Sequence, residues 1–196
     1  LTFANALRAM LRQAPNVVML GEIRDYETAS IAINASLTGH LVFSTLHTND
    51  APSAVTRLTD IGVKPFLIAS ATRCLMAQRL VRKICPKCES PATPENSDLL
   101  ALGLDPDKIK DPNFMAGKGC DKCNGTGHKG RFGLFEVFVV DDESRKMIVN
   151  QVTTTELRKR AREVGMRTLR EDGARKAVAG MTTANEVLRV TVGDES

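Results

Sequence analysis

The sequence predicts an α/β protein built on a parallel sheet, and three observations support this prediction. Residues 17–20 (VVML) form an apolar run of the kind found in strands that are buried on both faces of a parallel sheet. Residues 41–45 (LVFST) form a second apolar, β-branched run. Helix signals follow each run, and the order strand, helix, strand, helix is typical of a parallel α/β sheet.

The first strand lies between two predicted helices. Residues 1–13 have the apolar spacing of an amphipathic helix, which residues 14–16 (APN) end. After the strand, Asp25 is placed to cap a helix that runs to about Ala35, and Gly39 marks its end. The chain has no starting methionine, so we expect it to be part of a longer protein.

Two further helices are predicted after the second strand. Asp50 is placed to cap the first of them, with Pro52 in its first turn. Pro65 opens the next, which is expected to run to about residue 77. Cys74 lies among apolar residues of this helix, so we expect its thiol in the core.

The second half of the chain is predicted to contain an insertion, one strand and several short helices. Residues 89–118 are rich in proline and aspartate, which predicts a loop-rich insertion with a short helix near 97–103. Residues 131–140 (RFGLFEVFVV) predict a strand. Residues 143–192 predict three or four short helices, and glycines are expected to separate them: Gly165, Gly173 and Gly180.

Composition and charge are those of an ordinary globular domain. Of the 196 residues, 42% are hydrophobic and 26% are charged. No apolar run approaches the roughly 20 residues that span a bilayer, and the first residues lack the apolar core of a secretion signal. The net charge is only +4. The densest basic stretch, residues 158–162, is expected to be a solvated helix face, with binding of anionic lipid or nucleic acid as the alternative.

Polar side chains follow both predicted strands. Glu22 stands in GEIRD after the first strand, and His47 stands in STLHTND after the second. Because the carboxyl ends of parallel strands meet at one edge of a sheet, both side chains should border the same crevice. Phosphoryl transfer needs an acid that holds magnesium or orients water, and a donor that contacts the γ-phosphate. The alternative is that Glu22 and Asp25 only cap a helix and that His47 is a loop residue.

Four of the five cysteines form two CxxC pairs, CPKC at 85–88 and CDKC at 120–123. Each CxxC turn places two thiolates on one side of a tight loop, and two turns complete a tetrahedral site. We therefore expect a structural zinc ion bound by Cys85, Cys88, Cys120 and Cys123. Redox-active CxxC motifs and disulfides are the alternatives, and the absence of a secretion signal favours the metal.

These motifs resemble those of a known family. The run from LRAMLRQ through GEIRD and STLHTND is similar to the C-terminal motor domain of type II secretion and type IV pilus assembly ATPases, in the secretion NTPase superfamily. The similarity continues through QRLVRKICPKC, GCDKCNGTGHKGRFGLFEV and GMTTANEVLRVT. In this family GEIRD is the Walker B segment and STLHTN is the histidine box. The resemblance implies that Glu22 is the catalytic or magnesium-associated acid and that His47 senses the γ-phosphate.

The resemblance also implies a domain plan. Residues 1–80 should be the second half of a RecA-like ATPase core, which makes the fold a partial RecA-like parallel sheet. Residues 81–131 should be a tetracysteine zinc-binding insertion, and residues 132–196 a closing strand with a C-terminal helical subdomain. One departure is the turn at residues 14–16, where family members often carry acidic residues.

The resemblance implies an ATPase that uses Mg²⁺ with ATP as a homohexamer. The phosphate loop GxxxxGK[ST] and the aspartate-rich box are absent from residues 1–196, so we expect this chain alone to be inactive. Hexameric motors need positive charge across the subunit boundary, and four arginines are candidates for nucleotide or interface contacts. They are Arg24, Arg131, Arg8 and Arg12. For each, a salt bridge that holds the fold or the hexamer is the alternative.

The family role is to drive pilin or pseudopilin assembly through an inner-membrane platform protein. The resemblance thus implies a cytoplasmic protein peripherally associated with the inner membrane, with no membrane span of its own and no nucleic-acid partner. Type II secretion and type IV pilus extension share these motifs.

The rival function is a non-enzymatic zinc-binding interaction module. CDKCNGTG resembles the repeat of J-domain chaperones but occurs once, and a nucleic-acid-binding zinc ribbon would lack an aromatic platform.

Overall fold

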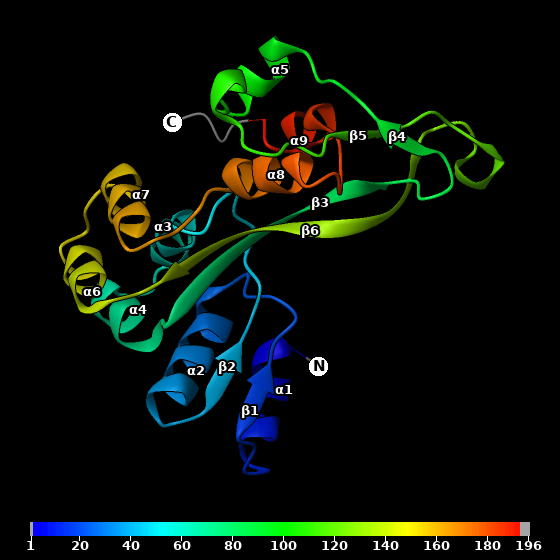
Figure 1. Ribbon diagram of the computed structural model, residues 1–196. Coiled ribbons are helices and arrows are strands. Elements are labelled where there is room, and N and C mark those ends of the chain that lie inside the picture. Colours follow the sequence, from blue (N-terminus) through cyan, green and yellow to red (C-terminus); the bar gives the residue numbers. More distant parts are fainter. Residues whose placement is uncertain (1, 193–196) are drawn as a thin grey trace. The chain divides into compact units, whose positions relative to one another are not determined.

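The computed structural model describes residues 2–192, which form a mixed α/β fold (Figure 1). The α-helices are α1 (Phe3–Leu11), α2 (Tyr26–Leu37), α3 (Ser53–Asp60), α4 (Pro65–Ala71), α5 (Asn96–Ala101), α6 (Asp142–Val149), α7 (Thr154–Glu163), α8 (Leu169–Val178) and α9 (Ala184–Val190). The strands are β1 (Val17–Met19), β2 (Leu41–Phe43), β3 (Cys74–Ile84), β4 (Glu89–Pro91), β5 (Met115–Gly117) and β6 (His128–Val139). Two short 3-10 helices are η1 (Pro106–Lys108) and η2 (Asp121–Cys123).

The chain divides into two compact units. One contains Leu1–Met76 with Val137–Met166, and the other contains Ala77–Glu136 with Arg167–Ser196. The candidate acid and histidine both belong to the first unit, and the cysteine turns belong to the second. The expected domain limits, at residues 80 and 131, remain a prediction.

The first unit contains the expected order of strand, helix and strand. β1 and β2 pair in parallel, with Val17 opposite Leu41 and Met19 opposite Phe43. The helix α2 connects them and packs on β2, and the three elements lie together in Figure 1. Asp25 caps α2, as expected, because its carboxylate accepts the backbone N–H of Thr28 at 2.8 Å. The sequence signals of this region are therefore sufficient to place both strand ends.

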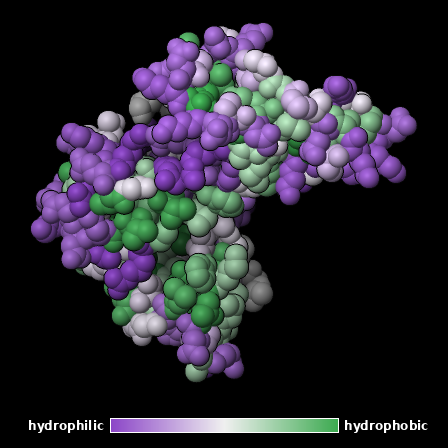
Figure 2. Space-filling model, in the orientation of Figure 1, coloured by the Kyte–Doolittle hydropathy of each residue, from purple (hydrophilic) through white to green (hydrophobic). Residues whose placement is uncertain are grey.

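The expectation that the first strand is buried on both faces is wrong for the described residues. Val18 is buried, whereas Val17 and Met19 are exposed, and so are their partners on β2, Leu41 and Phe43. The reason is that α2 covers only one face of this two-stranded sheet. Figure 2 shows a hydrophobic area over β1 and β2. An apolar hollow of about 280 Å³ lies beside β2.

The segment after Pro65 departs from the prediction. The helix α4 ends at Ala71, and residues 74–84 form the strand β3 rather than a continued helix. Cys74 is consequently exposed at the start of β3, not in the core. β3 pairs with β6, so tertiary pairing overrides the local helix preference of CLMAQ. Buried residues then alternate with exposed ones along the strand, as at Ala77 and Val81.

The second unit contains a strand pair that the sequence pattern did not indicate. β4 and β5 pair antiparallel, with Ser90 opposite Ala116, inside the segment that we expected to be loop-rich. Each strand is only three residues long, which is too short for an alternating pattern to stand out. The expected short helix is present as α5.

Between β6 and residue 192 the structure contains four helices, in agreement with the prediction of three or four. Gly165 and Gly180 follow α7 and α8 with positive φ angles of 98° and 75°. The expectation for Gly173 is wrong, because it lies inside α8 and is buried. A Cβ atom at this position would lie 2.3 Å from Cγ1 of Val187, so glycine here permits close packing of α8 on α9.

A buried carboxylate ties α9 to β3. The side chain of Glu186 is 1% exposed, and its oxygens accept the backbone N–H of Arg82 at 3.0 Å and the guanidinium of Arg82 at 2.7 Å. Arg189 donates to the same carboxylate at 2.7 and 3.1 Å. Burial alone would raise the pKa of Glu186, but the hydrogen bonds from Arg189 and Arg82 lower it to about 2.

We expect Glu186→Gln to destabilise the second unit by on the order of 3 kcal/mol at pH 7. Because the folded pKa lies below the ordinary value of 4.5, the carboxylate stabilises the fold above about pH 4.5. This contribution is lost as the pH falls toward 2. Urea unfolding at pH 7 and at pH 3 should therefore show a smaller difference between variant and parent at pH 3. Glu143→Gln, at an exposed pair with Lys146, is the matched control and should change stability by less than about 0.5 kcal/mol. A constant difference at both pH values would contradict the assignment.

Candidate functional site

The ends of β1 and β2 bring Glu22 and His47 together. Nε2 of His47 lies 2.8 Å from Oε2 of Glu22, and the guanidinium of Arg24 pairs with Oε1 of the same carboxylate. The Glu22 side chain is 20% exposed, whereas those of Arg24 and His47 are 70% and 78% exposed. The structure therefore places a fixed acid between two donors that extend into solvent.

Backbone pairing continues beyond the strands and fixes this arrangement. The N–H of Ile23 donates to the carbonyl of Thr45 at 3.0 Å. The hydroxyl of Thr45 donates to the carbonyl of Gly21 at 2.5 Å. These bonds bracket Glu22 on one segment and lead directly into His47 on the other. Thr45 is a residue that sequence reasoning missed, although its place in STLHTND was available as a signal.

The electrostatics of the cluster favour an ionised carboxylate. The hydrogen bonds from Arg24 and then from His47 hold the pKa of Glu22 below its ordinary value. The pKa of Arg24 is raised by the same contact. His47 donates through Nε2 when the ring carries its proton there. Asp25, not Glu22, caps α2, so capping does not account for Glu22.

The other candidate arginines lie apart from this cluster or outside its unit. Arg8 pairs with Glu27 at 2.8 Å, which joins α1 to α2, so the salt-bridge alternative describes it. Arg12 is exposed at the end of α1. Arg131 is exposed on β6, in the second unit. Roles at a nucleotide or a subunit boundary remain predictions for all three.

The basic stretch of α7 is only partly the solvated face that we expected. Arg158 pairs with Asp50 at 2.8 Å, and Arg160 pairs with Asp141. Their side chains are partly buried because they join α7 to two loops of the first unit. Lys159 and Arg162 are the exposed basic residues of this stretch. Two cations are a small basic surface, and binding of anionic lipid or nucleic acid there remains a prediction.

The four cysteines of the CxxC pairs gather in the second unit, as predicted. Their sulfur atoms all lie within 4.8 Å of one another. The sulfur atoms of Cys85 and Cys120 are 3.9 Å apart, as are those of Cys88 and Cys123. Four thiolates about 2.3 Å from a central zinc ion would be about 3.8 Å apart, so the residues present fit a tetrahedral metal. A disulfide would require about 2 Å.

Backbone N–H groups around the cluster favour thiolates. Sγ of Cys123 accepts the N–H of Cys120 at 3.2 Å and that of Gly127 at 3.3 Å. Burial raises the pKa of the Cys123 thiol, but these N–H groups outweigh it and lower the value to about 6. Burial raises the pKa of Cys88 to about 12, since nearby thiolates cannot all ionise without a cation. The donor set and its polar surroundings suit a divalent metal.

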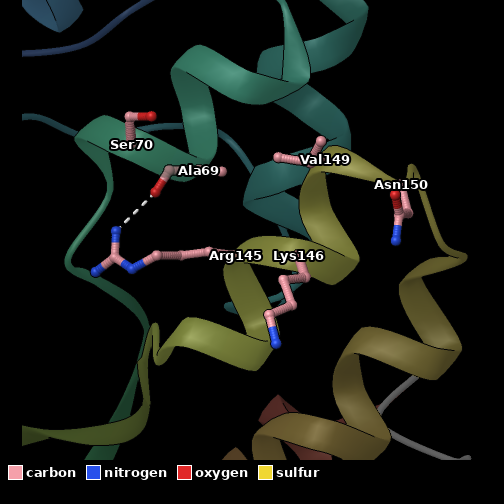
Figure 3. Close-up of a pocket in the computed structure, with 6 residues that line it drawn as sticks. All are labelled: Ala69, Ser70, Arg145, Lys146, Val149 and Asn150. Carbon is pink, nitrogen blue, oxygen red and sulfur yellow. Dashed lines mark hydrogen bonds between the residues drawn. The ribbon is translucent and has the colours of Figure 1, made fainter.

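A groove between α4 and α6 offers no comparable chemistry (Figure 3). It has a volume of about 350 Å³ and is lined by Ala69, Ser70, Arg145, Lys146, Val149 and Asn150. Arg145 donates to the carbonyls of Ala69 at 2.7 Å and Val140 at 3.2 Å. Because its guanidinium is engaged with the backbone, Arg145 holds the fold. The other cation of the lining, Lys146, pairs with Glu143 at 3.1 Å.

Comparison with known proteins shows the family of this chain. A family model described as "Type II/IV secretion system protein" matches residues 1–189. The chain belongs to this family. It is 52% identical over 192 residues to the type IV pilus assembly ATPase PilB of Thermus thermophilus, and it is 50% identical over 191 residues to type II secretion system protein E of Pseudomonas aeruginosa. Family membership favours the motor over the interaction module.

The chain spans only part of these type II/IV secretion relatives. The matched segments cover 98% and 97% of this chain, but 22% of the Thermus protein and 38% of the Pseudomonas protein. The solved structure of the pilus retraction motor PilT with bound ADP is similar with a TM-score of 0.65 and 25% identity, over 96% of this chain and 43% of that one. No helix among residues 2–192 has both the length and the hydrophobicity needed to cross a membrane.

Proposed function

We propose that this chain supplies the acid and the histidine of an ATP site in a hexameric motor ATPase. The motor hydrolyses ATP to drive pilin or pseudopilin assembly in type IV pilus biogenesis or type II secretion. The observation that carries the proposal is the contact between Glu22 and His47 at the ends of two adjacent parallel strands. Relatives that bear the names of pilus assembly ATPases share this part of the chain.

In this proposal each residue has a distinct task. Glu22 is the carboxylate that holds magnesium or orients the attacking water, and its low pKa keeps it ionised at neutral pH. His47 donates from Nε2 toward the γ-phosphate. Magnesium bound with ATP neutralises part of the phosphate charge near Glu22. The phosphate loop comes from a part of the protein outside residues 1–196, since GxxxxGK[ST] does not occur here.

Family membership supports a proposal for the surrounding assembly. We propose a homohexamer with a partial RecA-like core, in the cytoplasm and peripherally attached to the inner membrane through a platform protein. The tetracysteine cluster holds zinc in a structural role, because all four ligands come from the protein and no position stays open for a substrate.

We expect His47→Ala to lower ATP turnover of the intact protein about tenfold to a hundredfold, because one donor to the transferring phosphate is lost. The zinc content and far-UV circular dichroism should not change, since His47 is 78% exposed. Turnover is measured by phosphate release at saturating magnesium-ATP.

His40→Ala is the matched control for this experiment. His40 lies in the same unit and contacts the carbonyl of Ala35 through Nδ1 at 3.0 Å, so it supports the end of α2 only. ATP turnover of the His40→Ala variant should stay within about twofold of the parent. Equal turnover of the His47→Ala and His40→Ala variants would show that His47 has no catalytic role.

A further inference from the structure

Both oxygens of the Glu22 carboxylate contact neighbouring side chains. Arg24 occupies Oε1, and His47 occupies Oε2 at 2.8 Å. A carboxylate that orients water or holds magnesium must offer an oxygen in the right direction. Each oxygen keeps a second lone pair, but the guanidinium of Arg24 offsets the negative charge that attracts magnesium and polarises water.

The two donors can leave, whereas the acid cannot. Glu22 is 20% exposed and sits on backbone that is bonded to Thr45 through Ile23. Arg24 is 70% exposed, and Glu22 is the only ion-pair partner that residues 2–192 give it. Rotation of the largely exposed Arg24 side chain breaks that ion pair.

A nucleotide supplies a competing acceptor. A triphosphate carries more negative charge than one carboxylate, and the planar guanidinium of arginine matches phosphate oxygens in pairs. Arg24 is two residues beyond Glu22, so the phosphates that approach the acid also approach the arginine. Without Arg24, the carboxylate and the phosphates repel each other.

Given the proposed function, we infer that Arg24 exchanges partners at this site. It pairs with Glu22 in the arrangement described above and moves to the nucleotide phosphates when they bind. The exchange frees Oε1 of Glu22 for magnesium or the attacking water. Arg24 thus acts as a binding residue whose release activates the acid, so that the acid is available only when nucleotide is present.

The exchange predicts a coupling between Glu22 and Arg24 in nucleotide affinity. In the parent protein, binding must break the pair between Arg24 and Glu22, which offsets part of the gain from the contact between Arg24 and phosphate. In Glu22→Gln there is no pair to break. Removal of Arg24 should therefore weaken binding more in the Glu22→Gln background than in the parent.

The test is a double-mutant cycle in the intact protein. Dissociation constants for the magnesium complex of the non-hydrolysable analogue AMP-PNP are measured for the parent, Glu22→Gln, Arg24→Gln and the double variant. We expect Arg24→Gln to raise the dissociation constant about fivefold more in the Glu22→Gln background than in the parent. Arg24→Lys should retain part of this coupling, because it keeps the charge but loses the paired geometry.

Arg57 provides a control for the cycle, and ATP turnover provides a second measurement. Arg57 is exposed on α3, so Arg57→Gln should show no coupling with Glu22→Gln. Equal effects of Arg24→Gln in both backgrounds would overturn the exchange, even where Glu22→Gln abolishes turnover. Parent-like turnover by Glu22→Gln would instead overturn the proposed function, so the two failures are distinguishable.

Discussion

Replacement of Cys88 by Ser is expected to release the metal from the intact protein. The parent should contain about one zinc ion per chain, and the variant less than about a tenth of that, because a hydroxyl does not replace a thiolate ligand. Cys88 and Cys120 belong to different turns, so loss of the metal also removes the connection between them. Structural zinc contributes about 10–16 kcal/mol of apparent binding free energy in small domains. Loss of the metal removes this contribution from the stability of the fold.

The measurement combines metal analysis with hydrogen exchange. Amides of residues 85–88 and 120–127 should exchange much faster in Cys88→Ser than in the parent. Cys74→Ser is the matched control, because Cys74 is exposed on β3 and lies outside the cluster. It should retain its zinc and the parent's exchange pattern. A parent protein without zinc, in which all four thiols react freely under native conditions, would end the metal assignment.

Replacement of Glu22 by Gln is expected to lower ATP turnover by about 10²-fold or more. The substitution keeps the size of the side chain and removes only the charge at the reacting centre. The Gln amide can still contact His47, so the ends of β1 and β2 should remain paired. Nucleotide binding should persist, since the phosphate loop supplies most of it. Loss of folding in this variant would show that Glu22 has a structural role.

The parts of the fold that sequence could predict have local causes. Asp25 caps α2 because a short carboxylate before a helical segment can accept the N–H of Thr28, whatever surrounds it. The CxxC turns bring their sulfur atoms together because the spacing itself forms a tight loop. Glu22 and His47 meet because both follow paired parallel strands. In each case the signal lies within a few residues of the feature.

The parts that failed depend on distant partners. Residues 74–84 carry helix-favouring residues, yet they form a strand because β6 pairs with them. Arg158 and Arg160 look like a solvated face until Asp50 and Asp141 are placed beside them. Gly173 resembles a helix breaker, but its role comes from Val187, which lies on another helix. The single sequence contains no local signal for any of these partners.

The pairing of Arg24 with Glu22 is another feature that the sequence alone does not predict. GEIRD places the two residues close in sequence, but only the structure shows that the arginine occupies one oxygen of the acid while His47 occupies the other. The pair between Arg24 and Glu22 is the contact that breaks in the exchange proposed for Arg24.

One measurement tests the central claim most directly, namely phosphate release by the intact protein at saturating magnesium-ATP, compared between the parent and Glu22→Gln. Zinc content and AMP-PNP binding are recorded on the same preparations. We expect steady turnover in the parent and a loss of about 10²-fold or more in Glu22→Gln, with zinc retained and nucleotide still bound. Turnover of Glu22→Gln at the parent rate would show that the acid at the end of β1 has no part in hydrolysis.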